Sequence, residues 1–315
     1  MTTVSDFAKR LGAHDNFLIL THKNPDGDTV MSAAALCRAL RRKNKKAYLY
    51  RNVQITDRQL PFVEKLFAPG HFSPKTTVSV DIAAENMFPD GFDGHVDFCI
   101  DHHSSNTHYA ETELVDGERS ACGELIRELI LALTGKLSKA EATLLYIALT
   151  TDTGAFQYAN VNENTFRCAA ELLRAGADAH NVMLKFFRKT SLTRLRLEGL
   201  LYSNMRVYRD GKLVIATVTR EMMREAGATE NDCDDLAGLT GRAEDALMNI
   251  TIREMEDGSS KISVRSAPGV SSGAVCAAFG GGGHELAAGC TIQATPEKAE
   301  KLLLEVIEEI CGDKL

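Results

Sequence analysis

Short apolar runs in the first half of the chain repeatedly end in aspartate or histidine. Runs at 16–20, 77–80 and 98–100 have the length of buried strands, and a run at 144–149 closes a helical stretch. The side chains at or just after these ends are His22, Asp26, Asp28, Asp81, Asp101, His102, His103 and Asp152. Carboxyl ends of parallel strands share one sheet edge, so we expect these side chains to converge. Converging carboxylates repel one another unless cations neutralise them, which predicts a metal site with two metals.

The order of the expected elements sets the fold class of the first half. Strands near 16–20, 47–50, 77–81 and 98–101 alternate with helical stretches at 29–43, 57–67, 120–133 and 138–150. This alternation is typical of an α/β domain whose mostly parallel sheet carries helices on both faces. Ser120 and Ser138 are the expected N-cap residues of the last two helices. We expect this domain to span residues 1–178.

The pattern changes in the second half of the chain. Residues 179–200 are helical in pattern and rich in Arg and Lys, which predicts a helical linker. Beyond it, Asp210-Gly211 and Asp257-Gly258 each separate two apolar strands, the signal of a β-hairpin. Four consecutive glycines then lead into His284. Residues 201–315 are therefore predicted to form a smaller α+β domain with its own core.

The first metal-binding segment is the loop that contains His22, Asp26 and Asp28. Gly27 allows a tight turn between the two aspartates, so that both carboxylates can face one opening. Hard oxygen ligands with one or two imidazoles favour Mn²⁺ or Mg²⁺ over zinc. The same residues are good turn formers, so a plain surface turn is the alternative. Asp81 and Asp152, on later elements, favour the metal site.

Composition limits the partners and the compartment of the protein. The formal net charge of −7 argues against binding of long nucleic acid, because phosphate contacts supply most of that affinity. No apolar stretch approaches the roughly 18 residues of a membrane span, and the N-terminus lacks the pattern of a secretory signal. The eight cysteines include no CxxC pair, which is typical of reduced thiols in a cytoplasmic protein. A homodimer formed through the first domain is left open.

Four segments of the first half resemble the sequential motifs of the DHH phosphoesterase superfamily. They are THKNPDGD, the strand end at Asp81, IDHHSSN and LTTDTGAF. Downstream, SVRS and GGGGHELAAG resemble the DHHA1 substrate-binding domain that accompanies it. The order and the two-domain length are similar to the NrnA-type group of oligoribonucleases and 3′-phosphoadenosine 5′-phosphate phosphatases. One departure is Val30-Met31-Ser32 where Ile-Gly-Ser is more usual, from which we expect altered packing and no lost ligand.

The resemblance implies a role for each motif residue. One metal would be held by His22, Asp26 and Asp81, and the other by Asp28, Asp81, His102 and Asp152. The implied cofactor is two Mn²⁺, with Mg²⁺ or Co²⁺ as substitutes. Asp101 would orient ligands, and His103 would point to the scissile phosphate, which makes both catalytic. The terminal phosphate or nucleotide would be bound by Arg265, Ser266, Gly281, Gly282, Gly283 and His284.

The expected activity is a metal-dependent phosphodiesterase that releases 5′-mononucleotides from very short RNA. Dephosphorylation of 3′-phosphoadenosine 5′-phosphate is a second expected reaction. Two alternatives stay open at this point. The same site could hydrolyse linear or cyclic dinucleotide messengers such as pApA, pGpG and cyclic di-AMP. A nucleotide-binding sensor without catalysis is the non-enzymatic alternative, although a sensor has no need of two metals beside a phosphate.

Overall fold

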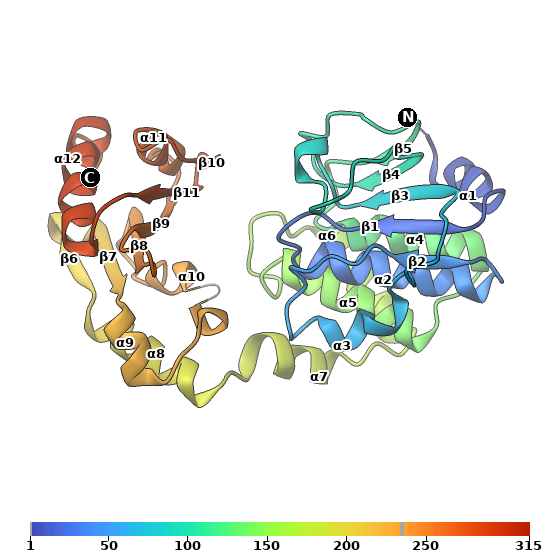
Figure 1. Cartoon of the computed structure of the whole chain (residues 1–315), viewed down its shortest axis with the longest axis horizontal. Coiled ribbons are helices and arrows are strands. Elements are labelled where there is room, and N and C mark those ends of the chain that lie inside the picture. Colours follow the sequence, from blue (N-terminus) through green and yellow to red (C-terminus); the bar gives the residue numbers. More distant parts are fainter. Residues whose placement is uncertain (1, 234–235) are drawn as a thin grey trace. The chain divides into compact units, whose positions relative to one another are not determined.

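The computed structural model describes residues 2–233 and 236–315. The chain divides into two compact units, Met1–Lys189 and Thr190–Leu315, each with its own hydrophobic core (Figure 1). The division falls inside the segment 179–200 that we expected to be a helical linker. The expected domain bounds themselves stay a prediction.

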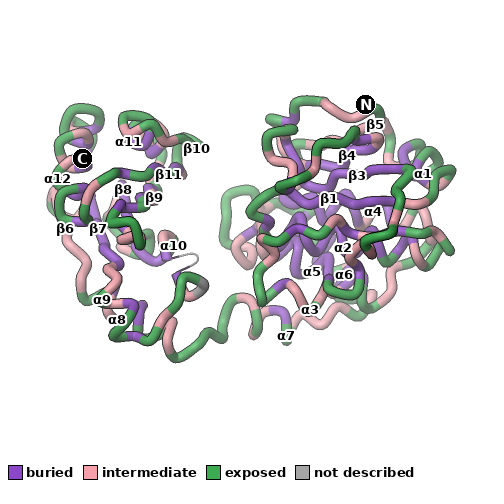
Figure 2. Tube along the Cα trace, viewed as in Figure 1, coloured by how far each residue is buried: buried purple, intermediate pink, exposed green. Residues whose placement is uncertain are grey.

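The first unit is built on a five-stranded sheet in the order β2-β1-β3-β4-β5. Every neighbouring pair in it is parallel. The strands are β1 (Phe17–Leu20), β2 (Ala47–Leu49), β3 (Thr76–Val80), β4 (Phe98–Asp101) and β5 (Thr112–Val115). All residues of β1, β3 and β4 are buried, as expected for strands covered on both faces (Figure 2). The prediction of a parallel α/β sheet is confirmed.

Helices cover one face of this sheet. They are α1 (Val4–Gly12), α2 (Gly27–Arg42), α3 (Leu60–Val63), α4 (Cys122–Thr134), α5 (Lys139–Asp152), α6 (Glu163–Arg174) and α7 (Ala179–Met183), with the short 3-10 helix η1 (Glu64–Leu66) and the short π-helix η3 (Leu184–Arg188). The short 3-10 helix η2 (Glu85–Met87) lies on the other face. Phe17 and Ile19 of β1 belong to the same core as the buried residues of α2, α4 and α5. On the opposite face, Leu18 and Leu20 pack with aromatic residues of loops and of the region around η2. On that face, the helical element described here is the short helix η2.

Two helix starts differ from the expected ones. The helix expected at 57–67 is confined to α3 and η1, with Pro61 in the first turn of α3. Proline is tolerated in a first turn but not inside a helix, so the helix starts there. α5 is capped by Ser138 as predicted, in a capping box with Glu141. The prediction of a Ser120 cap was wrong, because the N-cap residue of α4 is Ala121 and its side chain caps nothing.

The second unit contains a six-stranded sheet in the order β10-β11-β9-β8-β7-β6. Its strands are β6 (Arg206–Tyr208), β7 (Leu213–Val218), β8 (Met248–Glu254), β9 (Ser260–Ser266), β10 (Gly282–His284) and β11 (Ala287–Ile292). All pairs are antiparallel except β7 with β8. Both predicted hairpins are present: Asp210-Gly211 joins β6 to β7, and Asp257-Gly258 joins β8 to β9. Asp210, Gly211 and Gly258 have positive φ, as such tight turns require.

Helices pack on both faces of this second sheet. They are α8 (Leu192–Ser203), α9 (Arg220–Ala226), α10 (Ala237–Thr240), α11 (Ser272–Ala277) and α12 (Pro296–Cys311), with the turns η4 (Arg209–Gly211) and η5 (Glu230–Cys233). Leu213 and Ile215 of β7 share a core with α11 and α12, whereas Ala216 and Val218 share one with α8 and α9. Among the helices described, none combines the length and the apolar character needed to cross a membrane. All eight cysteines are buried free thiols.

Candidate metal centre

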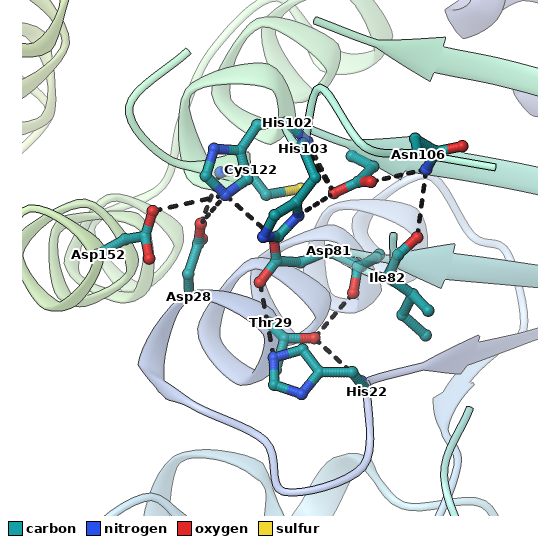
Figure 3. Close-up of polar contacts among 12 residues, drawn as sticks. His22, Asp28, Thr29, Asp81, Ile82, His102, His103, Asn106, Cys122 and Asp152 are labelled. Atoms are coloured by element: carbon teal, nitrogen blue, oxygen red, sulfur yellow. Dashed lines mark hydrogen bonds and ion pairs between the residues drawn. The ribbon is translucent and has the colours of Figure 1, made fainter. Parts of the chain in front are cut away.

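The eight predicted side chains do converge at one edge of the first sheet. Figure 3 labels His22, Asp28, Asp81, His102, His103 and Asp152 among them. His22 follows β1, Asp81 follows β3, and His102 follows β4. Asp26 and Asp28 lie at the start of α2, and Asp152 is the last residue of α5. Residues that are far apart in the chain thus meet because parallel strands end at a common edge.

Two groups of ligand-type atoms form within this cluster. Nε2 of His22 lies 3.7 Å from Oδ1 of Asp26 and 3.9 Å from Oδ2 of Asp81. Nε2 of His102 lies 3.3 Å from Oδ1 of Asp81, 3.4 Å from Oδ2 of Asp152 and 3.9 Å from Oδ2 of Asp28. The two oxygens of Asp81 therefore face different groups. This is the geometry expected of a carboxylate that bridges two cations.

Backbone carbonyls orient both of these imidazoles. Nδ1 of His22 lies 2.7 Å from the carbonyl oxygen of Lys23, and Nδ1 of His102 lies 3.0 Å from that of Arg119. A carbonyl only accepts hydrogen bonds, so Nδ1 carries the proton in each ring and Nε2 faces the carboxylates. Metal-binding histidines in proteins are held in this way, with the second ring nitrogen donating to a carbonyl or a carboxylate.

Asp28 is fully buried and is held by the start of α4. The backbone N–H groups of Cys122 and Gly123 donate to its two carboxylate oxygens at 2.6 and 3.0 Å, and Oγ of Ser32 donates to Oδ1 at 2.8 Å. The carboxylate therefore supplies the capping contacts that Ala121 lacks. Burial and the charges of Asp81 and Asp152 nevertheless raise the pKa of Asp28 well above its usual range. A cation beside Asp28 would reverse that effect.

Asp81 gives the clearest indication that the cluster suits metal ions. Its side chain is 2% exposed, and Oδ1 accepts no hydrogen bond from any described residue. Its backbone φ of 62° lies in the left-handed region, which non-glycine residues rarely adopt. A buried carboxylate oxygen without a donor is costly unless a cation fills the place. Oxygen-rich groups with one imidazole each fit Mn²⁺ or Mg²⁺.

The charges of the cluster act strongly on its histidines. Burial lowers the pKa of His22, but the neighbouring Asp26 outweighs it and raises that pKa to about 9. In His102 the effect of burial is overcome by Asp81, Asp28 and Asp152, which raise the pKa to about 11. Burial raises the pKa of Asp152 to about 7, against the opposing charge of His102. The cluster thus holds positive charge, as protons or as metal ions.

His103 has a different partner from the other two histidines. Its Nδ1 lies 2.7 Å from Oδ1 of Asp101, a carboxylate that is fully buried. The backbone N–H of His102 donates to the same oxygen at 2.8 Å. Nε2 of His103 is therefore its free nitrogen, on a ring that is 37% exposed. This arrangement leaves Nε2 open to a substrate. The contact of His103 with the scissile phosphate, which the resemblance implies, stays a prediction.

Comparison with known proteins identifies the family. The model of the DHH family, N-terminal domain, matches residues 16–149, and that of the DHHA1 domain matches residues 210–313. A Thermus thermophilus protein named bifunctional oligoribonuclease and PAP phosphatase NrnA is 33% identical over 92% of this chain and 89% of its own length. This chain belongs to the DHH family. The resemblance seen in the motifs is confirmed.

Further relatives extend over the whole chain. A Bacillus subtilis protein with the same name is 24% identical over 98% of this DHH chain and 99% of its own length. The crystal structure of an exopolyphosphatase-related protein from Bacteroides fragilis has a TM-score of 0.88, covers 97% of this chain and 96% of its own, and is 24% identical. That structure shows that the two units have a known fold.

The DHHA1 domain carries the six residues predicted to bind substrate. Arg265 on β9 pairs with Ala287 on β11, which in turn pairs with His284 on β10. Arg265 is exposed, and no described carboxylate forms an ion pair with it. Its Nη1 donates to the carbonyl of Val264 at 3.0 Å. The guanidinium is thus available to an anion, and exposed His284 lies on the same part of the sheet.

Three of the remaining predicted residues of this set, Ser266, Gly281 and Gly283, have structural roles. Oγ of Ser266 donates to the carbonyl of Val270 at 2.7 Å and receives a hydrogen bond from Oγ of Ser272 at 2.8 Å. A Cβ on Gly281 would lie 2.4 Å from Cβ of Cys290, and one on Gly283 would lie 2.6 Å from the carbonyl oxygen of Ala287. Gly282 has open space around it. Their roles in substrate binding stay a prediction.

Sequence reasoning missed several residues that shape the metal centre. Ser32 and the N–H groups of Cys122 and Gly123 hold Asp28, and the carbonyl of Arg119 holds His102. Ser32 lies four residues after Asp28 on α2, a helical spacing that the sequence does show. The other contacts are made by backbone groups of distant segments, which nothing in the local sequence marks. Asn106 was part of a recognised motif, but it was given no role.

Proposed function

We propose that this protein is a metal-dependent phosphodiesterase that hydrolyses very short oligoribonucleotides to 5′-mononucleotides. A second reaction, removal of the 3′ phosphate from 3′-phosphoadenosine 5′-phosphate, belongs to the same proposal. The observation that carries it is Asp81, whose two oxygens face two separate histidine-carboxylate groups. Relatives named oligoribonuclease and PAP phosphatase support the choice of substrate class.

The proposed ligands follow the two groups. One cation would be held by His22, Asp26 and Asp81, and the other by Asp28, Asp81, His102 and Asp152. We propose two Mn²⁺, with Mg²⁺ or Co²⁺ as substitutes. Such a pair of cations lowers the pKa of water and neutralises charge on the phosphoryl group.

The remaining residues act on the substrate itself. In its doubly protonated form, with Nδ1–H donating to Asp101, the ring of His103 would donate Nε2–H to an oxygen of the scissile phosphate. Arg265 would bind a terminal phosphate through two parallel hydrogen bonds, which a guanidinium forms well. Water attacks phosphorus, and the 3′ oxygen of the neighbouring nucleoside leaves with a proton. No residue of the protein needs to form a covalent bond with the substrate.

Product analysis tests this proposal. Di- to hexaribonucleotides, 3′-phosphoadenosine 5′-phosphate, pApA, pGpG and cyclic di-AMP are each incubated with Mn²⁺, Mg²⁺ or chelator. We expect mononucleotides from the shortest RNAs with Mn²⁺ and none with chelator. Preferential turnover of cyclic di-AMP would move the function to messenger hydrolysis, and binding without any turnover would make the protein a sensor.

The proposed setting is the cytoplasm, supported by eight buried cysteines that are all free thiols. The proposed partners are short RNAs or small nucleotides. Long duplexes are not among them, since the net charge of −7 disfavours binding to a polyanion. Membranes are not proposed as partners either, because no apolar stretch approaches the length of a membrane span.

A further inference from the structure

Asn106 donates a hydrogen bond to Asp101, the carboxylate that also binds His103. Asn106 and His103 are labelled in Figure 3. Asn106 is 8% exposed, in the loop that follows β4. Its Nδ2 donates to Oδ2 of Asp101 at 2.6 Å and to the carbonyl of Ile82 at 3.3 Å. Its Oδ1 accepts the backbone N–H of His108 at 2.8 Å. Both ends of the carboxamide are therefore in use, and the donor end points at a carboxylate.

The contacts of Asp101 show what this donor does. Oδ1 of Asp101 receives Nδ1–H of His103 at 2.7 Å and the backbone N–H of His102 at 2.8 Å. Oδ2 receives Asn106. With donors on both oxygens, the carboxylate plane cannot rotate without breaking a hydrogen bond in a fully buried place. The plane of the carboxylate in turn fixes the direction of the imidazole of His103.

The position of His103 makes that direction matter. Its Nδ1 is 3.7 Å from Oδ1 of Asp81, the oxygen that has no donor, and its ring centroid is 4.5 Å from that of His102. The ring thus stands at the rim of the metal centre with Nε2 free. A small rotation would move Nε2 away from a phosphate bound there, and catalysis is sensitive to such displacements.

We propose that Asn106 is a positioning residue for the hydrolysis, which acts by locking the Asp101 carboxylate so that Nε2 of His103 points at the scissile phosphate. This inference rests on the proposed function. The tether to Ile82, directly after Asp81, also ties the loop of His103 to the segment that carries the bridging carboxylate. The described side-chain contacts of Asn106 are to Ile82, Cys99, Asp101 and His108, none of which is a proposed metal ligand, so its effect would pass through Asp101 and His103.

Two substitutions separate this role from a merely structural one. Asn106→Asp keeps the shape of the side chain and the acceptor for His108, but replaces the donor facing Asp101 with an oxygen. Asn106→Ala removes the side chain. Both changes also remove the donor to the carbonyl of Ile82, so a role limited to loop structure predicts less folded protein with an unchanged kcat for the folded fraction. The positioning role predicts that both variants lose about 10- to 100-fold in kcat on a diribonucleotide, with KM and Mn²⁺ affinity little changed.

Asn181→Asp is the matched control. Nδ2 of Asn181 donates to Oδ2 of Asp178 at 2.8 Å, which is the same pair of groups at an exposed site. The control should keep wild-type kcat. If Asn106→Asp also keeps wild-type kcat, or if either Asn106 variant loses Mn²⁺ binding, the positioning role is wrong.

A double-mutant cycle shows whether the effect passes through His103. In a His103→Ala background, Asn106→Ala should cause no further loss of kcat, because the residue through which it acts is gone. If the loss of kcat in the double variant equals the product of the losses in the two single variants, the proposal is wrong. The free energies of unfolding of all variants, measured in urea, correct for any loss of folded protein.

A spectroscopic readout keeps this inference separate from the proposed function. The Nδ1 proton of His103, hydrogen-bonded to Asp101, is followed by NMR in the Mg²⁺-loaded protein. We expect its resonance to shift or vanish in Asn106→Asp and to stay in place in Asn181→Asp. An unchanged resonance would contradict the positioning role. Failure of the wild-type protein to cleave any short RNA would contradict the proposed function alone.

Discussion

The backbone N–H of Cys122 donates to Oδ2 of Asp28 at 2.6 Å, across 94 residues of chain. The contact joins the start of α4 to a fully buried carboxylate of the proposed metal centre. It gives the helix the capping group that Ala121 lacks, and it holds a proposed metal ligand in place. The fold of the DHH domain and its metal centre therefore depend on the same hydrogen bond.

Asp81→Ala should abolish turnover while the protein stays folded. We expect a loss of at least about 1,000-fold in kcat/KM and of the rise in Tm that Mn²⁺ gives the wild-type protein, because both cations lose a ligand. Activity assays and thermal melts with and without Mn²⁺ measure this. Asp57→Ala, at an exposed aspartate, is the control. Substantial activity of Asp81→Ala with Mn²⁺ would contradict a bridging role.

Ser32→Ala tests the support of Asp28. Removal of the Oγ hydrogen bond should weaken Mn²⁺ binding by about 10-fold, since neighbours that orient metal ligands contribute on this scale. Excess Mn²⁺ should restore kcat, because no ligand is lost. Calorimetric titration gives the affinity, and Ser203→Ala on α8, where the hydroxyl bonds to a helix carbonyl, serves as control. Equal Mn²⁺ affinity in both variants would refute the support by Ser32.

Gly27→Ala tests the close approach of α2 to α5. A Cβ at this position would lie 2.4 Å from Oγ1 and 2.7 Å from Cβ of Thr151, so the two helices must move apart. We expect a loss of about 1–3 kcal/mol in the free energy of unfolding and reduced activity, since Asp28 and Asp152 lie on these helices. Gly70→Ala, with open space around it, should be neutral. Unfolding of both variants in urea gives their free energies of unfolding, and a value for Gly27→Ala equal to that of the wild type would contradict the close approach of the two helices.

Arg265→Ala tests the proposed binding of a terminal phosphate by the DHHA1 domain. KM for short RNA with a terminal phosphate should rise by at least about 10-fold, because a bidentate charged hydrogen bond is lost, while metal content stays the same. Lys298→Ala, an exposed cation on α12, should leave KM unchanged. Equal KM values for Arg265→Ala and wild type would remove Arg265 from the substrate site.

Stability of the metal-free protein should fall as pH rises. His22 has a pKa raised from 6.5 to about 9, so its contribution is fully present below pH 6.5 and is lost as pH rises toward 9. Asp152 has a pKa raised from 3.8 to about 7, so the folded state becomes less favourable as pH rises from about 4 to 7. Thermal melts from pH 5 to 9 with chelator should show this fall. With saturating Mn²⁺ we expect no fall in Tm over this pH range. An equal fall in Tm with chelator and with Mn²⁺ would contradict the assignment of these groups to a metal centre.

The positions of β1, β2, β3 and β4 could be predicted from the sequence, because buried parallel strands are continuous apolar runs with polar residues after them. The convergence of His22, Asp81 and His102 followed from the common edge at which parallel strands end. The order of the strands in the sheet and the strand β5 were not predicted. The support of Asp28 by α4 and the lock of Asp101 by Asn106 could not be predicted. They depend on which backbone N–H or side-chain donor faces a carboxylate after packing, and local sequence does not encode this. The cap of α4 was misassigned to Ser120 for the same reason.

Anomalous X-ray diffraction from crystals grown with Mn²⁺ tests the central claim most directly. We expect two manganese peaks, one on each side of the Asp81 carboxylate and about 3.5–4 Å apart. One would lie against His22 and Asp26, and the other against Asp28, His102 and Asp152. A single peak, or none within reach of Asp81 at saturating Mn²⁺, would contradict the two-metal centre and the hydrolysis proposed for it.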